Sequence, residues 1–206
     1  MSGEAIVGLE SGRVIRHVPW ALVALRAGVT AALGVGLVAG GLTDGRVMAL
    51  FAVGFASDYF DGVVARACGV ATRRLRQADS TVDTAFYLVL GAVTYRLHRE
   101  VVQRHATALA ICLGTLAVWA VLDLVRWRAA AGFHAWSAKL FAAALGVWAV
   151  ALYGFGADGP WLVVACAVGT FSHLEGIAIS CTLREHVTDV ATWPQALRLR
   201  RRSLAP

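Results

Sequence analysis

The sequence predicts an all-α, polytopic membrane protein with one membrane-embedded domain, and three observations support this. Hydrophobic residues make up 58% of the 206 residues and charged residues only 16%, whereas charged residues are about 25% of an ordinary soluble domain. Apolar runs of the length that a bilayer requires recur along the chain, and arginine-rich segments separate several of them. The four cysteines show no CxxC pairing, so neither a disulfide framework nor a zinc site is expected.

Six transmembrane helices are expected, each close to the roughly 20 residues that cross a bilayer. In chain order they cover residues 19–41, 46–66, 79–97, 103–125, 136–156 and 160–183. The chain is thereby divided into an N-terminal cytoplasmic or interfacial segment (1–18), a six-helix domain (19–183) and a basic cytoplasmic tail (184–206). The sequence leaves open whether residues 4–17 form a short amphipathic helix at the interface or a disordered tail. No cleaved signal peptide is expected, because no basic region followed by an apolar run opens the chain.

The distribution of arginine predicts the orientation. With the N-terminus inside, the cytoplasmic segments contain Arg13, Arg16, Arg66, Arg73, Arg74, Arg76, Arg126, Arg128 and the arginine-rich tail. The connection between the third and fourth spans is an exception, because it contains Arg96, Arg99 and Arg104. The overall bias favours both termini, and the loop expected at 67–78, on the cytoplasmic side of an inner (cytoplasmic) membrane.

Two pairs of aspartates flank the loop expected at 67–78. One pair lies near the end of the apolar run before the loop, and the other pair opens the apolar run after it. Asp58 and Asp61 are three residues apart, and Asp79 and Asp83 are four apart. Both spacings place the paired carboxylates on one face of a helix, about 5–6 Å apart at Cβ. Carboxylates inside membrane segments are costly and therefore indicate a functional site.

Four converging carboxylates predict bound cations. Oxygen-only ligands favour Mg²⁺, Mn²⁺ or Ca²⁺ over zinc or copper, and two such ions would form the clamp used in displacement at phosphorus. The alternative is that the aspartates cap helices or pair with the nearby Arg73, Arg74 and Arg76.

The segment from 58 to 83 resembles the signature of the CDP-alcohol phosphotransferase (CDP-alcohol phosphatidyltransferase) family. That signature consists of Asp, two residues, Asp-Gly, two residues, Ala-Arg, a spacer, and two aspartates four residues apart. The chain fills these positions in order with Asp58, Asp61, Gly62, Ala65, Arg66, Asp79 and Asp83. Leu75 departs from the signature, which has glycine there. The pattern is closest to phosphatidylglycerophosphate and phosphatidylinositol-phosphate synthases.

The resemblance implies a reaction and roles for these residues. A phosphatidyl group would pass from a CDP-diacylglycerol-like lipid to a small polar alcohol, releasing CMP, with two Mg²⁺ or Mn²⁺ ions held by the four aspartates. Asp83 would be the general base, and Gly62, Ala65 and Arg66 would lie against the nucleotide. A homodimer is also implied.

Arg26 lies inside the first expected span, and a buried arginine requires an anion. A substrate phosphate or one of the aspartates would serve, and contact with the nucleotide donor is the expected role, with snorkelling to the interface as the alternative. In this region the family often has Asn and Thr where the chain has Trp20 and Val23.

The acceptor is predicted from positive charge. Lys139, together with Arg126 and Arg128, would form a basic pocket for a phosphorylated acceptor, with anchoring at the cytoplasmic interface as the alternative. Glycerol 3-phosphate is the first expectation and inositol phosphate the second; another alcohol acceptor, a divalent-cation transporter and an inactive scaffold are further alternatives. Asp123 is expected to make a structural pairing with Arg126 or Lys139.

The remaining charged residues leave fewer predictions. His173 and Glu175 receive no assigned role. The basic tail is expected to bind anionic lipid headgroups, and no nucleic-acid partner is expected, because no RNA- or DNA-binding motif is present.

Overall fold

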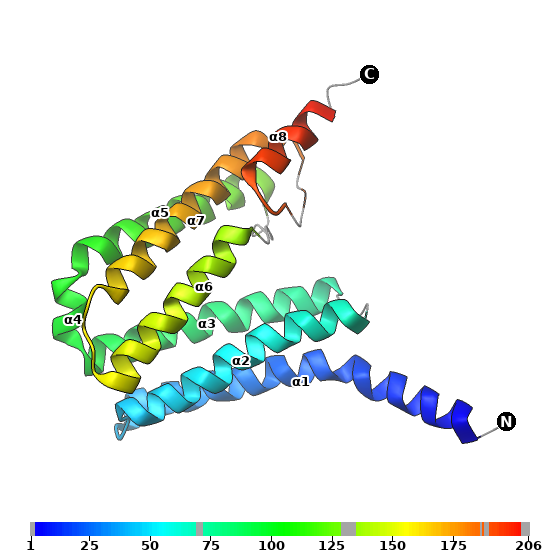
Figure 1. Cartoon of the computed structure of the whole chain (residues 1–206), viewed down its shortest axis with the longest axis horizontal. Coiled ribbons are helices and arrows are strands. Elements are labelled where there is room, and N and C mark those ends of the chain that lie inside the picture. Colours follow the sequence, from blue (N-terminus) through cyan, green and yellow to red (C-terminus); the bar gives the residue numbers. More distant parts are fainter. Residues whose placement is uncertain (1–2, 69–71, 129–134, 186, 188–189, 203–206) are drawn as a thin grey trace. The chain divides into compact units, whose positions relative to one another are not determined.

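The structure is a computed structural model that describes residues 3–68, 72–128, 135–185, 187 and 190–202. Within that part of the chain, residues 3–17, 61–68, 73, 76 and 77 are described by their backbone. The described chain is helical and contains no strand, which confirms the all-α class (Figure 1). It divides into two compact units, residues 1–99 and 100–206.

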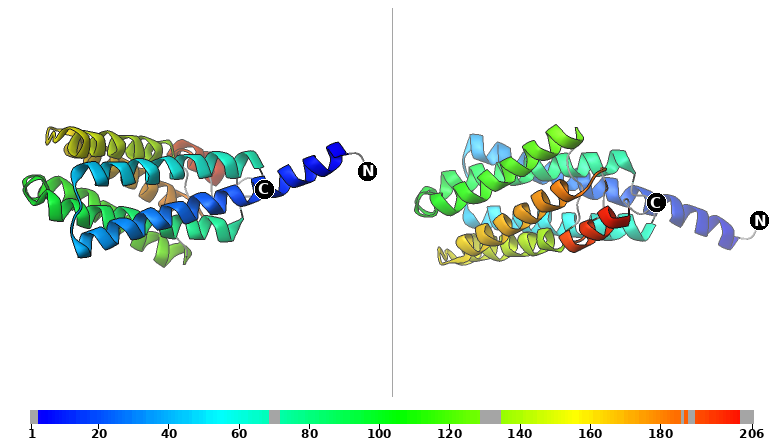
Figure 2. Two further views of the ribbon diagram at one scale, coloured as in Figure 1. Left: turned by 90° about the horizontal axis from the view of Figure 1, so that it is seen from below. Right: turned by 90° about the horizontal axis from the view of Figure 1, so that it is seen from above.

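The first unit consists of α1 (Gly3–Ala39), α2 (Asp44–Cys68) and α3 (Arg73–Leu97). α1 packs against both α2 and α3, so a side chain on its inner face is able to reach both neighbours. The segment at 4–17 is helical and continues into the first apolar run without a break, as the long blue ribbon of Figure 2 shows. Pro19 is buried inside this helix, where it removes one backbone hydrogen bond.

The second unit contains six helical elements among the residues described, and the first is α4 (Arg99–Arg104), of which all but Arg99 belong to this unit. α5 (Ala106–Trp127), α6 (Trp136–Ala149), the π-helical turn η1 (Val150–Gly154), α7 (Trp161–Thr182) and α8 (Trp193–Arg202) follow. α7 packs against α5, α6 and α8. Two of its glycines permit close contact, because a Cβ on Gly169 would lie 2.6 Å from Phe141 and one on Gly176 would lie 2.6 Å from Trp119.

Four helical segments are long and apolar enough to cross a membrane, among the residues described. They are Val18–Ala39, Ala106–Trp127, Trp136–Gly154 and Trp161–Thr182. The second and third expected spans lie within α2 and α3, which are not among these four segments. The protein is an integral membrane protein, and the count of six spans stays a prediction.

The connection between α2 and α3 is shorter than the sequence predicts. The loop was expected at 67–78, but α2 extends to Cys68 and α3 begins at Arg73. Thr72 accounts for the earlier start of α3, because it is the N-cap residue and its hydroxyl accepts a hydrogen bond from the Leu75 backbone N–H at 3.2 Å. Such a cap satisfies one of the free N–H groups of the first turn.

Candidate active site

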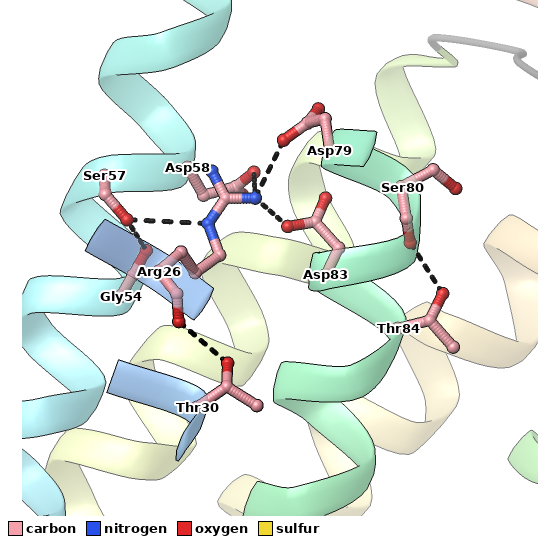
Figure 3. A network of polar contacts seen from close by, with 9 residues as sticks. All are labelled: Arg26, Thr30, Gly54, Ser57, Asp58, Asp79, Ser80, Asp83 and Thr84. Atoms are coloured by element: carbon pink, nitrogen blue, oxygen red, sulfur yellow. Dashed lines mark hydrogen bonds and ion pairs between the residues drawn. The ribbon is translucent and has the colours of Figure 1, made fainter. Parts of the chain in front are cut away.

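Three carboxylates converge in the first unit. Asp58 projects from α2, and Asp79 and Asp83 project from successive turns of α3 (Figure 3). Each offers one carboxylate oxygen, and these oxygens lie within 4.8 Å of one another. The three side chains are partly buried, so their mutual repulsion is screened less than it would be on an open surface. A cation at this point would relieve that repulsion.

Arg26 provides such a cation from α1. Its Nη1 atom lies 2.9 Å from Asp79 Oδ1 and 3.4 Å from Asp58 Oδ1, and it also contacts Asp83 Oδ1 (Figure 3). The Arg26 side chain is only 1% exposed. A guanidinium so thoroughly removed from water requires anionic partners, and the three carboxylates supply them.

Ser57 and Thr30 help to fix the position of Arg26. Arg26 Nε donates to Ser57 Oγ at 3.5 Å, while the Ser57 hydroxyl donates to the carbonyl of Gly54 at 2.7 Å. Because its proton is used in this way, the Ser57 oxygen is left to accept from Arg26. One turn further along α1, the Thr30 hydroxyl donates to the Arg26 carbonyl at 2.8 Å.

Aromatic packing sets the separation of α2 and α3 next to the carboxylates. Phe86, one turn after Asp83 with 1% of its surface exposed, stacks on Phe51 with ring centroids 6.3 Å apart. The Phe86 ring also lies against Gly54, where a Cβ would be only 2.7 Å from it. Glycine at position 54 therefore leaves room for the Phe86 ring of α3 against the backbone of α2.

Leu75 lies on the first turn of α3 and is buried, with 5% of its surface exposed. It occupies the position where the family signature has glycine, and the structure accommodates it as a packed apolar side chain. Of the two departures in the first span, Val23 is buried and Trp20 is exposed.

The other residues that the signature implicates lie on α2. Asp61, Gly62, Ala65 and Arg66 belong to the last turns of that helix, but their side chains fall outside the part of the chain that the structure describes. Asp61 as a metal ligand and the other three as nucleotide contacts stay predictions.

The three basic residues of the expected acceptor pocket all lie in the second unit. Arg126 is exposed, donates to the Leu183 carbonyl at 2.8 Å and stacks over Trp127, with its guanidinium carbon 4.9 Å from the ring centroid. Lys139 Nζ lies 4.2 Å from the centroid of Trp136. Arg128 is exposed and ends α5 in a left-handed conformation. A basic pocket formed by these residues stays a prediction.

Three polar residues of the second unit have contacts that the sequence did not specify. Asp123 on α5 accepts a hydrogen bond from the Ser180 hydroxyl on α7. His173 Nδ1 lies 3.2 Å from the Thr115 hydroxyl. Glu175 accepts from the backbone N–H of Trp193 at 3.2 Å and so holds the start of α8. Contacts between residues so far apart in the chain leave no signal in local spacing.

The carboxylate cluster fits a divalent cation. Its donor set is oxygen alone, which suits Mg²⁺ or Mn²⁺, and a positively charged nitrogen already lies within contact distance of all three side chains. The arrangement is able to bind cations and, through them, phosphate oxygens, and it includes carboxylates that can accept a proton.

Comparison with known families gives a match over most of the chain. The sequence model of the family described as CDP-alcohol phosphatidyltransferase matches residues 12–173. The matched region contains α2 and α3, with Asp58, Asp79 and Asp83, and the buried arginine of α1. Comparisons with curated proteins and with solved structures find no match to this chain.

Proposed function

This chain belongs to the CDP-alcohol phosphatidyltransferase family, and we propose that it transfers a phosphatidyl group from a CDP-linked lipid to a phosphorylated alcohol at the carboxylate cluster. Members of the family are transferases of substituted phosphate groups and use divalent metals. The observation that supports the site is the convergence of Asp58, Asp79 and Asp83 within 4.8 Å. The transporter and scaffold alternatives are not retained, because the family consists of transferases.

The metal ligands in this proposal are Asp58, Asp79 and Asp83, with Asp61 from the last turns of α2. When bound, two divalent cations would neutralise charge on the diphosphate of the donor and on the departing CMP. Arg26 adds a permanent positive charge beside the same carboxylates, where the diphosphate of the donor would enter.

Asp83 is the proposed general base. Its carboxylate takes the proton from the hydroxyl of the acceptor, and the hydroxyl oxygen forms a bond to the β-phosphorus of the donor. The bond between that phosphorus and the oxygen bridging to the α-phosphate breaks, and its electrons leave with CMP. The products are a phosphodiester lipid and CMP.

The first choice of acceptor is glycerol 3-phosphate, which would give phosphatidylglycerophosphate, and the second is inositol phosphate. The proposed source of positive charge for an acceptor phosphate is a set of three exposed residues: Arg126, Arg128, and Lys139 on the next helix. Serine, choline or ethanolamine would need less positive charge.

The proposed chemistry is placed at the cytoplasmic side of the membrane, where nucleotides are available. The excess of arginine in the expected cytoplasmic segments supports this orientation. A homodimer and a lipid donor of the CDP-diacylglycerol type complete the proposal.

CMP release by the purified chain in detergent tests the proposal. CDP-diacylglycerol is supplied with glycerol 3-phosphate, inositol phosphate or an unphosphorylated alcohol, in the presence of Mn²⁺, Mg²⁺ or EDTA. We expect CMP release with one phosphorylated acceptor, its loss in EDTA, and its recovery when Mn²⁺ is added in excess.

Two variants locate the reaction. Asp79→Asn removes a charge from the cluster and should lower CMP release at least 100-fold, as expected when a metal ligand or catalytic group is altered. Asp44→Asn is the matched control, because Asp44 is an acid at the start of α2, the helix of Asp58, and contacts His98 at 2.8 Å. Equal activities of the two variants would show that the cluster is not the site.

A further inference from the structure

The contacts of Arg26 are those of a cation at a shared focus. Three carboxylate oxygens, from two helices, approach one nitrogen of the guanidinium, Nη1 (Figure 3). An atom that contacts carboxylates from two helices takes the position that a monatomic cation would take in a metal site.

The charges of the four side chains in this contact do not balance. Asp58, Asp79 and Asp83 bring three formal negative charges, and Arg26 brings one positive charge. The excess negative charge favours a divalent ion at the same place. Such an ion lies about 2.0–2.6 Å from its oxygen ligands, so it would need the space next to the oxygens that Nη1 occupies, and it would repel the guanidinium.

We propose that Arg26 and the divalent metal compete for the same three carboxylates, with the guanidinium as the internal counter-ion of the metal-free protein. The inference rests on the metal site of the proposed function and extends it. Arg26 keeps the acidic helices together when metal is absent, and it sets a threshold for metal binding. Once Nη1 is displaced, its charge is available to a phosphate of the donor.

Such a displacement would involve the side chain of Arg26 and not its backbone. The backbone belongs to the continuous helix α1, and the Nε atom donates to Ser57. A rotation about the outer side-chain bonds would move Nη1 away from the carboxylates without breaking the helix. The cost is the loss of ion pairs, which the binding of metal offsets.

The affinity of the full-length chain for Mn²⁺, measured by electron paramagnetic resonance in detergent, tests the inference without substrate. Arg26→Gln should bind Mn²⁺ at least tenfold more tightly than the wild type. Arg26→Lys should show a smaller gain, because a lysine ammonium is a compact charge with fewer fixed contacts. Arg46→Gln is the matched control: Arg46 is on α2, donates to the Gly41 carbonyl at 2.6 Å, and should leave the affinity unchanged.

Thermal unfolding gives a second readout on the same proteins. In EDTA, Arg26→Gln should unfold at a lower temperature than the wild type, since three carboxylates have lost their cation. Added Mn²⁺ should raise the unfolding temperature of this variant more than that of the wild type. If Arg26→Gln cannot be purified, the Mn²⁺ affinity of Arg26→Lys, compared with that of the wild type, tests the competition.

The outcomes separate the inference from the function on which it rests. Mn²⁺ binding that is lost in Asp79→Asn but is unchanged or weaker in both Arg26 variants overturns the competition and leaves the metal site intact. If neither the wild type nor any Arg26 variant binds Mn²⁺, the metal site of the proposed function is overturned together with the inference.

Discussion

For Arg26, the sequence predicts that the side chain needs an anionic partner but does not decide which anion that partner is. A charged side chain within an apolar run requires an anion, and both a substrate phosphate and the aspartates satisfy that requirement. The choice depends on contacts between residues 53 and 57 positions apart along the chain, for which local spacing has no signal. By contrast, Asp79 and Asp83 are four residues apart on one helix, and their proximity follows from the helical repeat.

Thr72 is the residue on which the start of α3 depends. Thr72→Ala removes the hydroxyl that accepts from Leu75 N–H, and loss of such a cap typically costs about 1 kcal/mol. We expect a lower unfolding temperature in detergent and faster amide hydrogen exchange at residues 73–76.

Thr84→Ala is the control for the cap. Thr84 is exposed and lies on the same helix, and its hydroxyl donates to the Ser80 carbonyl within α3. If the backbone amides of the first turn of α3 exchange at the wild-type rate in both variants, the Thr72 cap does not stabilise the start of this helix.

At the scale of elements, the first unit is organised by α1, which packs against both acidic helices. The sequence indicates α2 and α3 from their apolar runs and the carboxylate pairs from their spacing. It does not indicate that Gly54 of one helix lies against Phe86 of the other, because any small residue and any aromatic residue in the two runs fit the same pattern. The sequence also does not predict the early start of α3, because an arginine-rich segment resembles a polar loop.

Gly54→Ala tests the contact between α2 and α3. The added Cβ would lie 2.7 Å from the buried Phe86 ring, and overpacking of this kind costs about 1–3 kcal/mol. We expect a lower unfolding temperature and, because Asp58 lies one turn beyond, weaker Mn²⁺ binding.

Gly91→Ala provides the comparison, because a Cβ at position 91 of α3 meets nothing within 4 Å. That change should leave stability unaltered or slightly raised, since alanine favours helix by up to about 1 kcal/mol. Adding Phe86→Leu to Gly54→Ala should recover part of the lost stability. A Gly54→Ala protein as stable as Gly91→Ala would contradict the close contact between Gly54 and the Phe86 ring.

α8 shows a different limit of sequence analysis. Its residues were expected to be part of a basic tail, whereas the structure has a helix whose Ala196 packs against Ile179, Leu183 and Val190. Glu175 and Thr182 of α7 accept from the backbone and the indole of Trp193. A helix of ten residues with four arginines lacks the apolar run that identified the others.

At the scale of the whole molecule, the all-α class and the membrane location follow from composition, because a chain with so few charges cannot cover itself with a polar surface. The family follows from a signature confined to residues 58–83, and the family match over residues 12–173 agrees with it. The acceptor does not follow in the same way. Positive charge in the second unit suggests a phosphate, but several phosphorylated alcohols share that chemistry.

The central claim is that the carboxylates of α2 and α3 perform the transfer, and Asp83→Asn tests it most directly. The measurement is the rate of CMP release at saturating Mn²⁺, CDP-diacylglycerol and acceptor, with Mn²⁺ binding followed on the same sample. Asparagine keeps an oxygen that is able to contact a metal but cannot accept the proton. We predict bound Mn²⁺ and a rate at least 100-fold below that of the wild type, in line with the contribution of a general base. A rate within threefold of the wild type would contradict the claim.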